Sequence, residues 1–540
     1  MPVLLRSSSD LNAPGATRWA TLTSDAISVA PETRVRDFAQ SLEEAFAKIG
    51  DTWWDIARQF GTRPDGSLCY TLACSPNASD FGLMLAQTEM VTAWAGDTPI
   101  TLVVCDDPWL FRHLARISGV QTGSSPPLFL RSLVLRGRGF LSRTRCAVRM
   151  FRAALRLRLQ PRKTTQGGAS LVSFGHPRST PEGHDGYFAD LMRENPHLRR
   201  VLHVDCGPQR ALELAAGGQT VSLQAWGSPL FALTLPFRRW RPEVAKDSPY
   251  FWLLCRAAAL EGGGGTAAML AWQEHCQARW LACCRPAVVT WPWENHPWER
   301  ALVREAKRLG TRTVGYQHSV VGQMMYHYSR RSLPDGDAAL PDLILCTSES
   351  TRQQLLAFGI PEGRLKIGGA LRFAEPPRTT YDPAAPVFMA VPFDAGVAHE
   401  MIEAAKAVKD RSLKFLVKDH PMFPVSFEES ETVRRTREPL TAQKAVSGVV
   451  YAATTVGLEA LVAGVPTLRF RSERVVAVDI MPASLKVPVA GRDDFETAIR
   501  NFAKPVPIDR EYCFGTPDDA LWRQALSLGE VCNKNGSVEG

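Results

Sequence analysis

Two polar segments in the last third of the chain contain residue types that bind phosphates and sugars. The first, Lys418-Asp419-His420-Pro421, follows the apolar run Leu413–Val417, which is typical of a buried strand. A histidine that precedes a proline has a restricted backbone. Its imidazole and the Lys418 ammonium can donate hydrogen bonds to a phosphate or a ribose. An ordinary loop histidine is the alternative interpretation.

The second segment begins with Thr454 and Thr455, between the apolar run Gly448–Ala452 and a predicted helix, Val456–Ala463. Two hydroxyls and the free N–H groups of a helix N-terminus can hold a phosphate. Glu459, one turn later, can accept hydrogen bonds from ribose hydroxyls. Plain capping of the helix by threonine is the alternative. Both segments are predicted at the carboxyl ends of parallel strands, where open α/β sheets bind ligands.

A third segment, upstream, carries a candidate general base. Glu294 lies in the aromatic run from Trp291 to Glu299, WPWENHPWE, and Gly315–Ser319, GYQHS, follows one helix later. A carboxylate at the end of a strand can take a proton from an acceptor hydroxyl, and the aromatic rings can stack on sugars. The alternative is an aromatic packing cluster, with Glu299 on a solvated helix face.

The positive charge of the chain is concentrated in one segment. The 540 residues carry 63 Lys and Arg against 55 Asp and Glu, a net charge of +8. Between Pro108 and Pro181 there are 14 Lys and Arg and no acidic residue, so the rest of the chain has 49 basic and 55 acidic residues. A local basic surface favours phosphates, anionic lipids or nucleic acid as partners.

Four arginines of this segment fall on one face of a predicted helix. Their spacing of four, three and four residues forms a single stripe, beside an apolar stripe of Val148, Phe151, Leu155 and Leu159. This pattern is typical of a helix that lies on a membrane surface; a buried helix with a solvated basic face is the alternative. Few aromatic residues interleave with the arginines and no nucleic-acid module is recognisable, so no nucleic-acid partner is expected. The four are Arg145, Arg149, Arg152 and Arg156.

Several other kinds of site are absent from the sequence. The 12 cysteines are scattered, with no CxxC pair, and there is no HExxH, GxSxG or GxxxxGK[ST] segment. We therefore expect no metal site and no cofactor. Scattered cysteines fit a reducing compartment. We find no signal peptide and no run of about 18 apolar residues. We expect a cytoplasmic protein, peripheral on the inner face of the membrane if the basic helix binds lipid.

Short apolar runs alternate with helical patterns from residue 100 onward. Ile100–Cys105, Ser170–Phe174 and Arg200–Val204 are among the first predicted strands, and Val465–Phe470 is the last. This alternation favours an α/β fold with parallel sheets. The last 200 residues show it most clearly and predict a doubly wound domain with polar segments at the carboxyl ends of its strands.

Two stretches of the chain resemble bacterial surface-carbohydrate biosynthesis proteins. The first is Trp293–Ser319, WENHPWERALVREAKRLGTRTVGYQHS, and the second runs from Pro341 to Gly368-Gly-Ala-Leu-Arg372-Phe. The downstream His-Pro and Thr-Thr pairs resemble those of bacterial sialyltransferases and Kdo transferases, which use CMP-activated 2-keto sugar acids. The resemblance covers about residues 170–470. It implies the GT-B fold, two Rossmann-like domains facing each other across a cleft, here with an N-terminal extension.

The resemblance also implies a division of the chain. Residues 1–335 would form the acceptor-side domain, including the basic segment 109–180, and residues 336–525 the nucleotide-sugar-binding domain, followed by a tail, 526–540. The donor-binding residues would be His420, Pro421, Lys418, Thr454, Thr455, Glu459 and Arg372.

Glu294 stands where the resemblance implies the catalytic base. The sialyltransferase pattern has two acids and a glycine there, whereas this chain has Glu294-Asn295-His296 and matches one acid. His296 and His318 are therefore alternative bases.

The expected function is metal-independent glycosyl transfer. A nonulosonic acid or Kdo-like sugar would move from a CMP donor to a surface polysaccharide, capsule or lipopolysaccharide acceptor. Two alternatives stay open: a CDP-glycerol-type glycerophosphotransferase, and a non-catalytic glycan-assembly protein with a degenerate GT-B fold.

Overall fold

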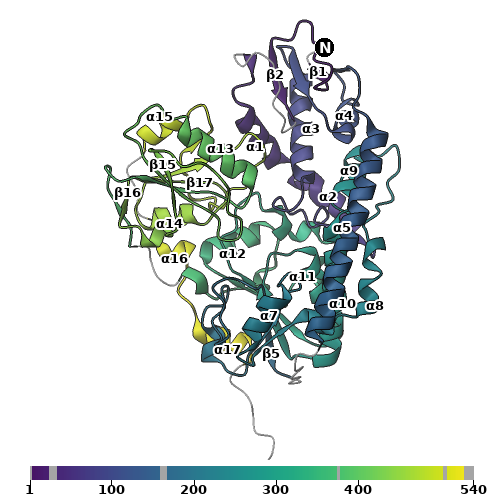
Figure 1. Cartoon of the computed structure of the whole chain (residues 1–540), viewed down its shortest axis with the longest axis vertical. Helices are drawn as coiled ribbons and strands as arrows, with labels where there is room; N and C mark the ends of the chain where they lie inside the picture. Colours follow the sequence, from purple (N-terminus) through teal and green to yellow (C-terminus); the bar gives the residue numbers. More distant parts are fainter. Residues whose placement is uncertain (1–2, 23–32, 159–166, 374–377, 503–507, 528–540) are drawn as a thin grey trace, which may run out of the picture.

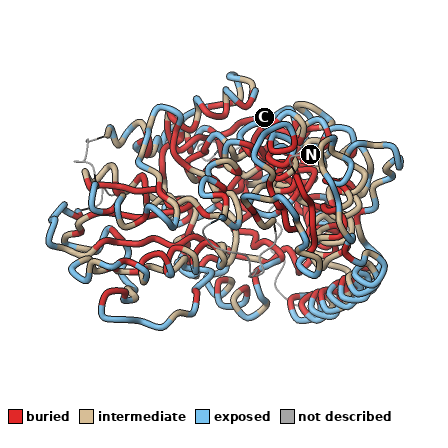
Figure 2. The backbone as a smooth tube through the Cα atoms, turned by 90° about the horizontal axis from the view of Figure 1, so that it is seen from above, coloured by how far each residue is buried: buried red, intermediate tan, exposed pale blue. Residues whose placement is uncertain are grey.

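The computed structural model describes residues 3–22, 33–158, 167–373, 378–502 and 508–527. Within them the chain forms three parallel sheets in succession, with helices packed against each (Figure 1). Strands such as β8 (Val288–Pro292) and β13 (Val387–Ala390) are buried along their whole length. This is expected where helices cover both faces of a parallel sheet. Seen from above, buried strands run through the interior and exposed segments lie at the rim (Figure 2).

The N-terminal unit has its own parallel sheet, with strands in the order β2-β3-β1-β4. The apolar residues near the start of the chain form the first, buried strand of this sheet. Residues 38–61 form two helices that meet at Ile49. The elements are β1 (Val3–Arg6), β2 (Arg18–Thr21), α1 (Phe38–Lys48), α2 (Gly50–Gly61), α3 (Phe81–Ala95), β3 (Thr101–Val104), α4 (Pro108–Leu114) and β4 (Val120–Thr122).

The middle unit holds a seven-stranded parallel sheet in the order β11-β10-β9-β8-β5-β6-β7. Its strands are β5 (Ala169–Ser173), β6 (Arg199–Leu202), β7 (Thr220–Ser222), β8, β9 (Arg312–Gln317), β10 (Leu343–Cys346) and β11 (Leu365–Ile367). Its helices are α5 (Leu128–Leu157), α6 (Leu191–Glu194), α7 (Pro208–Ala215), α8 (Pro229–Ala232), α9 (Phe251–Leu260), α10 (Gly265–Cys284), α11 (Pro297–Arg308) and α12 (Glu349–Ala357).

The C-terminal unit holds a six-stranded parallel sheet in the order β15-β14-β13-β17-β18-β19. A short parallel pair, β12 (Thr380–Tyr381) and β16 (Ala445–Val446), lies apart from it. The strands of the six-stranded sheet are β13, β14 (Phe415–Lys418), β15 (Val433–Thr436), β17 (Gly448–Tyr451), β18 (Thr467–Phe470) and β19 (Val489–Ala490). The helices are α13 (Ala395–Lys406), α14 (Val456–Val462), α15 (Phe495–Arg500), α16 (Arg510–Cys513) and α17 (Asp519–Ala525).

The two larger sheets share one topology. Counted from the first strand of each sheet, the strands follow the order 3-2-1-4-5-6, with a seventh at the edge of the middle sheet. This is the strand order of the doubly wound dinucleotide-binding fold. The two units meet across a cleft. The predicted fold class, GT-B with two Rossmann-like units and an N-terminal extension, is therefore confirmed.

The boundary between the two units lies later than predicted. β10 and β11 continue the middle sheet beyond residue 335, to Ile367. The helix α17, yellow in Figure 1, returns to the middle unit, where Trp522 packs 5.1 Å from the Tyr316 ring. The strand–helix pattern is the same in both units, so the sequence has no break that marks where one sheet ends. Most of the predicted tail, residues 528–540, lies outside the described residues.

Candidate functional site

A cleft of about 1300 Å³ separates the middle and C-terminal sheets. In a doubly wound sheet, ligands bind outside the carboxyl ends of the strands, where the strand order reverses. That point lies between β5 and β8 in the middle sheet and between β13 and β17 in the C-terminal sheet. Residues that follow these strands line the cleft, including His176 after β5, Val391 after β13 and Thr454 after β17.

The seven residues predicted to bind the donor all line this cleft. They come from two strand ends, from α14 and from the segment that connects the sheets, so the tertiary structure brings together residues up to 87 positions apart. Their roles in donor binding stay a prediction. They are Arg372, Lys418, His420, Pro421, Thr454, Thr455 and Glu459.

The His420 ring is held in the cleft wall. Its Nδ1 accepts a hydrogen bond from the Met422 backbone N–H at 3.3 Å, and its ring packs 6.3 Å from that of Phe393. The accepting Nδ1 leaves the Nε2–H to face a ligand. Burial, with the cations Arg372 and Lys418 nearby, lowers the pKa of His420, so its imidazole is neutral near pH 7.

The hydroxyls of Thr454 and Thr455 differ in whether they cap helix α14. Thr454 Oγ1 accepts from the Val456 backbone N–H at 3.4 Å, as the capping interpretation predicts. The Thr455 side chain makes no capping hydrogen bond. The Thr455 hydroxyl, unlike that of Thr454, is therefore not engaged in capping α14.

The cleft wall is positively charged. Two carboxyl groups line it, those of Asp419 and Glu459, and Asp419 is paired with Arg435. Burial raises the pKa of Glu459 to about 7, which reduces its negative charge at neutral pH. The six cationic side chains in the wall are Arg178, Arg372, Arg378, Lys418, Arg437 and Arg510. Such a concave basic wall attracts anions strongly.

Arg372 lies between the two units. Its Cζ lies 5.1 Å from the centre of the Tyr187 ring in the middle unit. Its charge acts on Glu294 and His318 in the middle unit and on Glu459 and His420 in the C-terminal unit. Within the described ranges no carboxylate forms an ion pair with it, so its charge is available to an anionic ligand.

Glu294 follows β8 in the middle unit and is half-buried. One carboxylate oxygen lies 3.3 Å from His296 Nδ1, and the other lies 3.8 Å from Nε2 of His318, a residue that lines the cleft. Burial raises the pKa of Glu294 to about 7, although Arg372 acts to lower it. A carboxyl group with this pKa can accept a proton at neutral pH.

Glu299 is buried, which corrects the expectation that it lies on a solvated helix face. Its Oε2 accepts hydrogen bonds from Trp291 Nε1 at 3.0 Å and from the Glu294 and Asn295 backbone N–H groups, both at 2.9 Å. Asn295 has a φ of +58°. Glu299 therefore holds the turn that carries Glu294, a role that its place in the first turn of an amphipathic helix did not reveal.

The tryptophans of this segment are also buried, so the expectation that they stack on sugars is wrong for them. Trp291, Trp293 and Trp298 are each at most 3% exposed. They form the aromatic packing cluster that was the alternative interpretation.

His296 and His318, the alternative bases, lie beside Glu294; His318 is buried and His296 half-buried. His296 Nε2 lies 3.3 Å from Ser75 Oγ, and burial lowers the pKa of His296 to about 3. The pKa of His318 is lowered well below its ordinary value by burial and by Arg372. Both imidazoles are weak bases in this environment.

His176 was not among the predicted site residues, although it carries the same signal as His420. Gly175-His176-Pro177 follows β5 just as Asp419-His420-Pro421 follows β14, and His176 and Arg178 line the cleft opposite His420. The rule that selected His420, a His-Pro pair at the end of a strand, also selects His176.

A second acid on the middle-unit side was also missed. Asp205, after β6, lies 2.9 Å from His203 Nδ1. It acts on the pKa values of Tyr70 and Tyr187, the same rings that Glu294 affects. Nothing in its local sequence distinguishes Asp205, because its proximity to Glu294 arises from the order of the parallel strands, in which only β5 separates β6 from β8.

The four arginines predicted to contact a membrane or acceptor lie outside the cleft. Arg145, Arg149, Arg152 and Arg156 line a shallow groove of about 430 Å³ on the outer side of α5. The predicted apolar stripe is not buried: Val148 and Leu155 are exposed, and Phe151 is half-buried. Leu159 lies outside the described residues.

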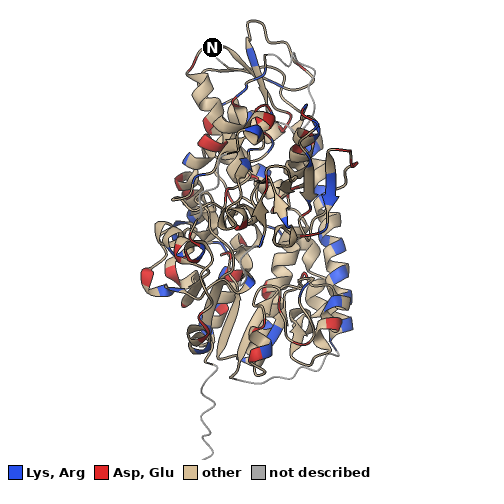
Figure 3. Ribbon diagram, turned by 90° about the vertical axis from the view of Figure 1, so that its left-hand side faces the viewer, with Lys and Arg blue, Asp and Glu red and all other residues tan. Residues whose placement is uncertain are grey.

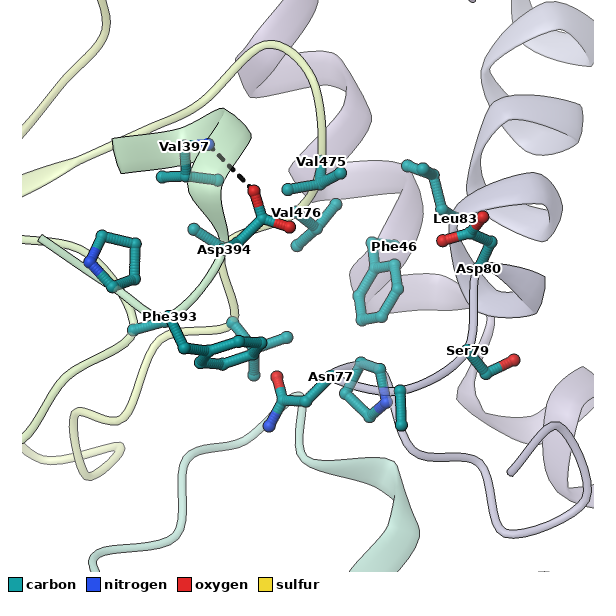
Figure 4. A pocket seen from close by; sticks show the side chains of 16 residues that line it. Phe46, Asn77, Ser79, Asp80, Leu83, Phe393, Asp394, Val397, Val475 and Val476 are labelled. Atoms are coloured by element: carbon teal, nitrogen blue, oxygen red, sulfur yellow. Dashed lines mark hydrogen bonds between the residues drawn. The ribbon is translucent and has the colours of Figure 1, made fainter. Parts of the chain in front are cut away.

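A smaller cavity of about 280 Å³ lies between the N-terminal and C-terminal units. Phe46 of α1 and Phe393 after β13 face it from opposite sides, and Asp394 caps α13 through the Val397 N–H (Figure 4). Ala453, next to Thr454, also lines it. Phe393, which packs beside His420, and Ala453, which precedes Thr454, thus connect this cavity with the C-terminal side of the main cleft.

The described ranges contain neither a candidate metal cluster nor a helix suited to cross a membrane. No cluster of three His, Cys, Asp or Glu side chains suited to a metal ion is present in the described ranges. Among the described helices, none combines the length and the apolar character needed to cross a membrane.

No protein-family model and no curated protein matches the chain. Among solved structures, UDP-N-acetylglucosamine 2-epimerase from Rickettsia bellii is 13% identical, with a TM-score of 0.37 over 67% of this chain and 94% of its own. CalG4, the calicheamicin glycosyltransferase, is 15% identical, with a TM-score of 0.37 over 67% and 93%. S. aureus MnaA, in a co-structure with UDP, is 10% identical, with a TM-score of 0.39 over 67% and 97%. These scores are low, and the assignment of the fold rests on the strand order of this chain.

Proposed function

We propose that this chain is a glycosyltransferase that moves a sugar from a nucleotide donor in the C-terminal unit to an acceptor held by the middle unit. One observation carries the proposal. A basic cleft joins the strand-reversal points of two doubly wound sheets, and a carboxyl group of pKa about 7, that of Glu294, lies 3.8 Å from His318, which lines the cleft.

The donor we propose is a CMP-linked 2-keto sugar acid of the nonulosonic or Kdo type. Its phosphate would lie between His420 and the Thr455 hydroxyl, and Arg372 would face its negative charge. As the bond between the sugar carbon and the phosphate oxygen breaks, negative charge grows on the departing CMP. Fixed donors and cations directed at that oxygen stabilise the transition state more than the ground state. We propose that these side chains neutralise the leaving phosphate without a divalent cation.

Glu294 is the base that we propose. The acceptor oxygen would bond to the sugar carbon while its proton passes to the Glu294 carboxylate. A base works best when its pKa is near the working pH, which favours Glu294 over His296, whose pKa is about 3. The acceptor would be a growing surface polysaccharide, capsule or lipopolysaccharide glycan on the cytoplasmic side of the membrane.

A thermal-shift comparison of CMP, CDP, UDP and GDP tests the donor nucleotide. We expect CMP to raise the melting temperature most, since a ligand at a hundred times its Kd stabilises a protein by about 2.7 kcal/mol. The His420→Ala variant should lose this shift, whereas His197→Ala, remote from the cleft, should keep it. A larger shift with UDP or GDP would contradict the proposed donor.

Turnover by the purified protein then separates the proposed activity from its alternatives. Release of CMP from CMP-linked sugar acids supports the proposal. Release of CMP from CDP-glycerol instead would indicate a glycerophosphotransferase. No turnover of either donor, in a protein that binds CMP, would indicate a non-catalytic assembly protein.

A further inference from the structure

The helix α5 leaves one face uncovered along its whole length. It has 30 residues, which is about 45 Å. One side packs on α10 through small and apolar residues such as Ala147, Met150 and Ala154. The opposite side carries five large apolar residues that are 45–63% exposed. Four are spaced by seven, an interval that keeps side chains on nearly one face over a few turns. The five are Leu130, Val134, Leu141, Val148 and Leu155.

A row of arginines follows the same interval beside this apolar stripe. Arg131, Arg138, Arg145 and Arg152 are also spaced by seven and are exposed, and α5 contains no acidic residue. Within the described ranges none of these four forms an ion pair. Figure 3 shows basic residues recurring along this long helix. The face therefore combines exposed apolar side chains with cations that no carboxylate neutralises.

The neighbouring turn of the middle unit extends the same surface. Leu230 and Leu233, of α8 and its C-cap, and Phe237 are exposed, and the Phe237 ring lies 6.2 Å from that of Phe140 on α5. Arg239, two residues later, is close enough to Arg136 for their charges to repel, which together with burial lowers the pKa of Arg239. We call the outer face of α5 with this turn the α5–α8 surface.

Charge and hydrophobicity together identify the occupant of this surface. A second copy of the chain would bring two rows of arginines together. A nucleic acid would meet the arginines but leave the apolar stripe in water. An anionic membrane contacts both, because its headgroups attract cations and its acyl boundary takes up apolar side chains. We propose that the α5–α8 surface binds the surface of a membrane that contains anionic lipids.

The surface also lies beside the acceptor side of the cleft. Pro208, which begins α7, lines the groove formed by Arg145, Arg149 and Arg152, and it follows Asp205 by three residues. Binding through α5 would place the carboxyl ends of the middle strands near the membrane, where a lipid-linked acceptor is held. This part of the inference rests on the proposed function; membrane binding itself does not.

Co-sedimentation with phosphatidylcholine vesicles, with and without phosphatidylglycerol, tests the inference on the full chain. We expect binding only when phosphatidylglycerol is present. The variant Arg131→Gln/Arg138→Gln/Arg145→Gln/Arg152→Gln should lose ~5-fold in vesicle affinity for each charge removed. The matched control removes four exposed arginines from other parts of the surface and should bind like the parent: Arg312→Gln/Arg411→Gln/Arg434→Gln/Arg492→Gln.

A second variant tests the apolar stripe at constant charge. Leu130→Ser/Leu141→Ser/Leu233→Ser should weaken vesicle binding at least tenfold and leave the melting temperature unchanged, since all three side chains are exposed. Equal binding by parent and arginine variant, binding to neutral vesicles alone, or a dimer that the arginine variant abolishes would each overturn the inference. CMP binding and turnover with a soluble acceptor should be unaffected, so failure here is distinct from failure of the proposed function.

Discussion

Glu294 experiences two opposing electrostatic effects. Burial raises its pKa, because the charged form loses hydration, while the Arg372 guanidinium favours the charged form. The result, a pKa of about 7, leaves the carboxyl group partly protonated under physiological conditions. A small change in either effect therefore changes the fraction of molecules in which Glu294 can accept a proton.

Transfer activity should fall as the pH decreases through about 7, because protonation of Glu294 removes the base. The profile of kcat/KM against pH should show this acid limb, since it reports the free enzyme. Glu294→Gln should lower kcat by about 10²–10⁴ without weakening CMP binding. An acid limb near pH 4.5, or full activity of the Gln variant, would rule out Glu294 as the base.

Arg372→Gln should move the acid limb to higher pH. Removal of the guanidinium takes away the charge that lowers the pKa of Glu294, so more protonated enzyme remains at neutral pH. Arg378→Gln is the matched control, because Arg378 also lines the cleft but does not contribute to the Glu294 shift. Identical profiles for the two variants would show that Arg372 does not act on the base.

Glu299→Ala should reduce both activity and stability. It leaves the Trp291 indole N–H and two backbone N–H groups without their acceptor, and each unsatisfied buried donor costs about 1–3 kcal/mol. Glu299→Gln retains an acceptor oxygen and should restore most of the activity. Urea unfolding and kcat measure the two effects. If the Gln variant were as impaired as the Ala variant, the Glu299 charge, and not its hydrogen bonds, would be responsible.

At the scale of elements, the carboxyl ends of parallel strands determine which side chains meet. His176 and Glu294 follow β5 and β8, and His420 and Thr454 follow β14 and β17. The segment between the sheets contributes Arg372, and α17 then returns to the middle unit. This return fixes the segment, because Trp522 Nε1 donates to the Gly368 carbonyl at 2.8 Å.

Trp522→Ala should destabilise the protein by about 3–5 kcal/mol, the usual cost of truncating a buried tryptophan. Trp522 packs against Phe188 and Tyr316 of the middle unit as well as binding Gly368. Trp522→Phe keeps one aromatic ring but loses the N–H and the second ring of the indole, so its loss should be smaller than that of the Ala variant, about 1–3 kcal/mol. Denaturant unfolding provides both values. A loss below about 1 kcal/mol for the Ala variant would mean that α17 does not hold the connecting segment.

At the scale of the molecule, the N-terminal unit is joined to the C-terminal unit by buried charge. Glu43 of α1 accepts hydrogen bonds from Arg469 and Arg471, and Arg469 also pairs with Asp479 at 3.2 Å. Arg469 is 5% exposed, so its charge depends on these partners. The N-terminal unit therefore helps to hold the C-terminal sheet in place and borders the cavity beside the cleft.

Glu43→Ala should destabilise the protein by about 3 kcal/mol, because it leaves a buried arginine with one carboxylate. Glu431→Ala breaks the exposed pair with Lys414 and should cost at most about 1 kcal/mol. Thermal unfolding compares the two, and hydrogen exchange should show faster exchange in α1 and β18 of the Glu43 variant alone. Equal losses would indicate that the two units are not held together by this pair.

The sequence by itself determined the fold class and several residues that line the C-terminal side of the cleft. Strands and helices each have their own spacing of apolar residues, which can be recognised in the sequence. Most predicted strands are present within a few residues of their expected positions. Lys418, His420, Thr454 and Thr455 were predictable because a strand end is a local feature. A polar residue directly after an apolar run can be recognised without knowledge of its neighbours.

Only the tertiary structure decided what depends on distant partners. Glu299 is buried, Asp205 lies near Glu294, and Arg372 lies between the two units, because elements far apart in the chain pack together. The same holds for α5, whose exposed side is set by its packing on α10. Local sequence fixes the periodicity of a helix or strand, but the side that is buried depends on which other elements cover it.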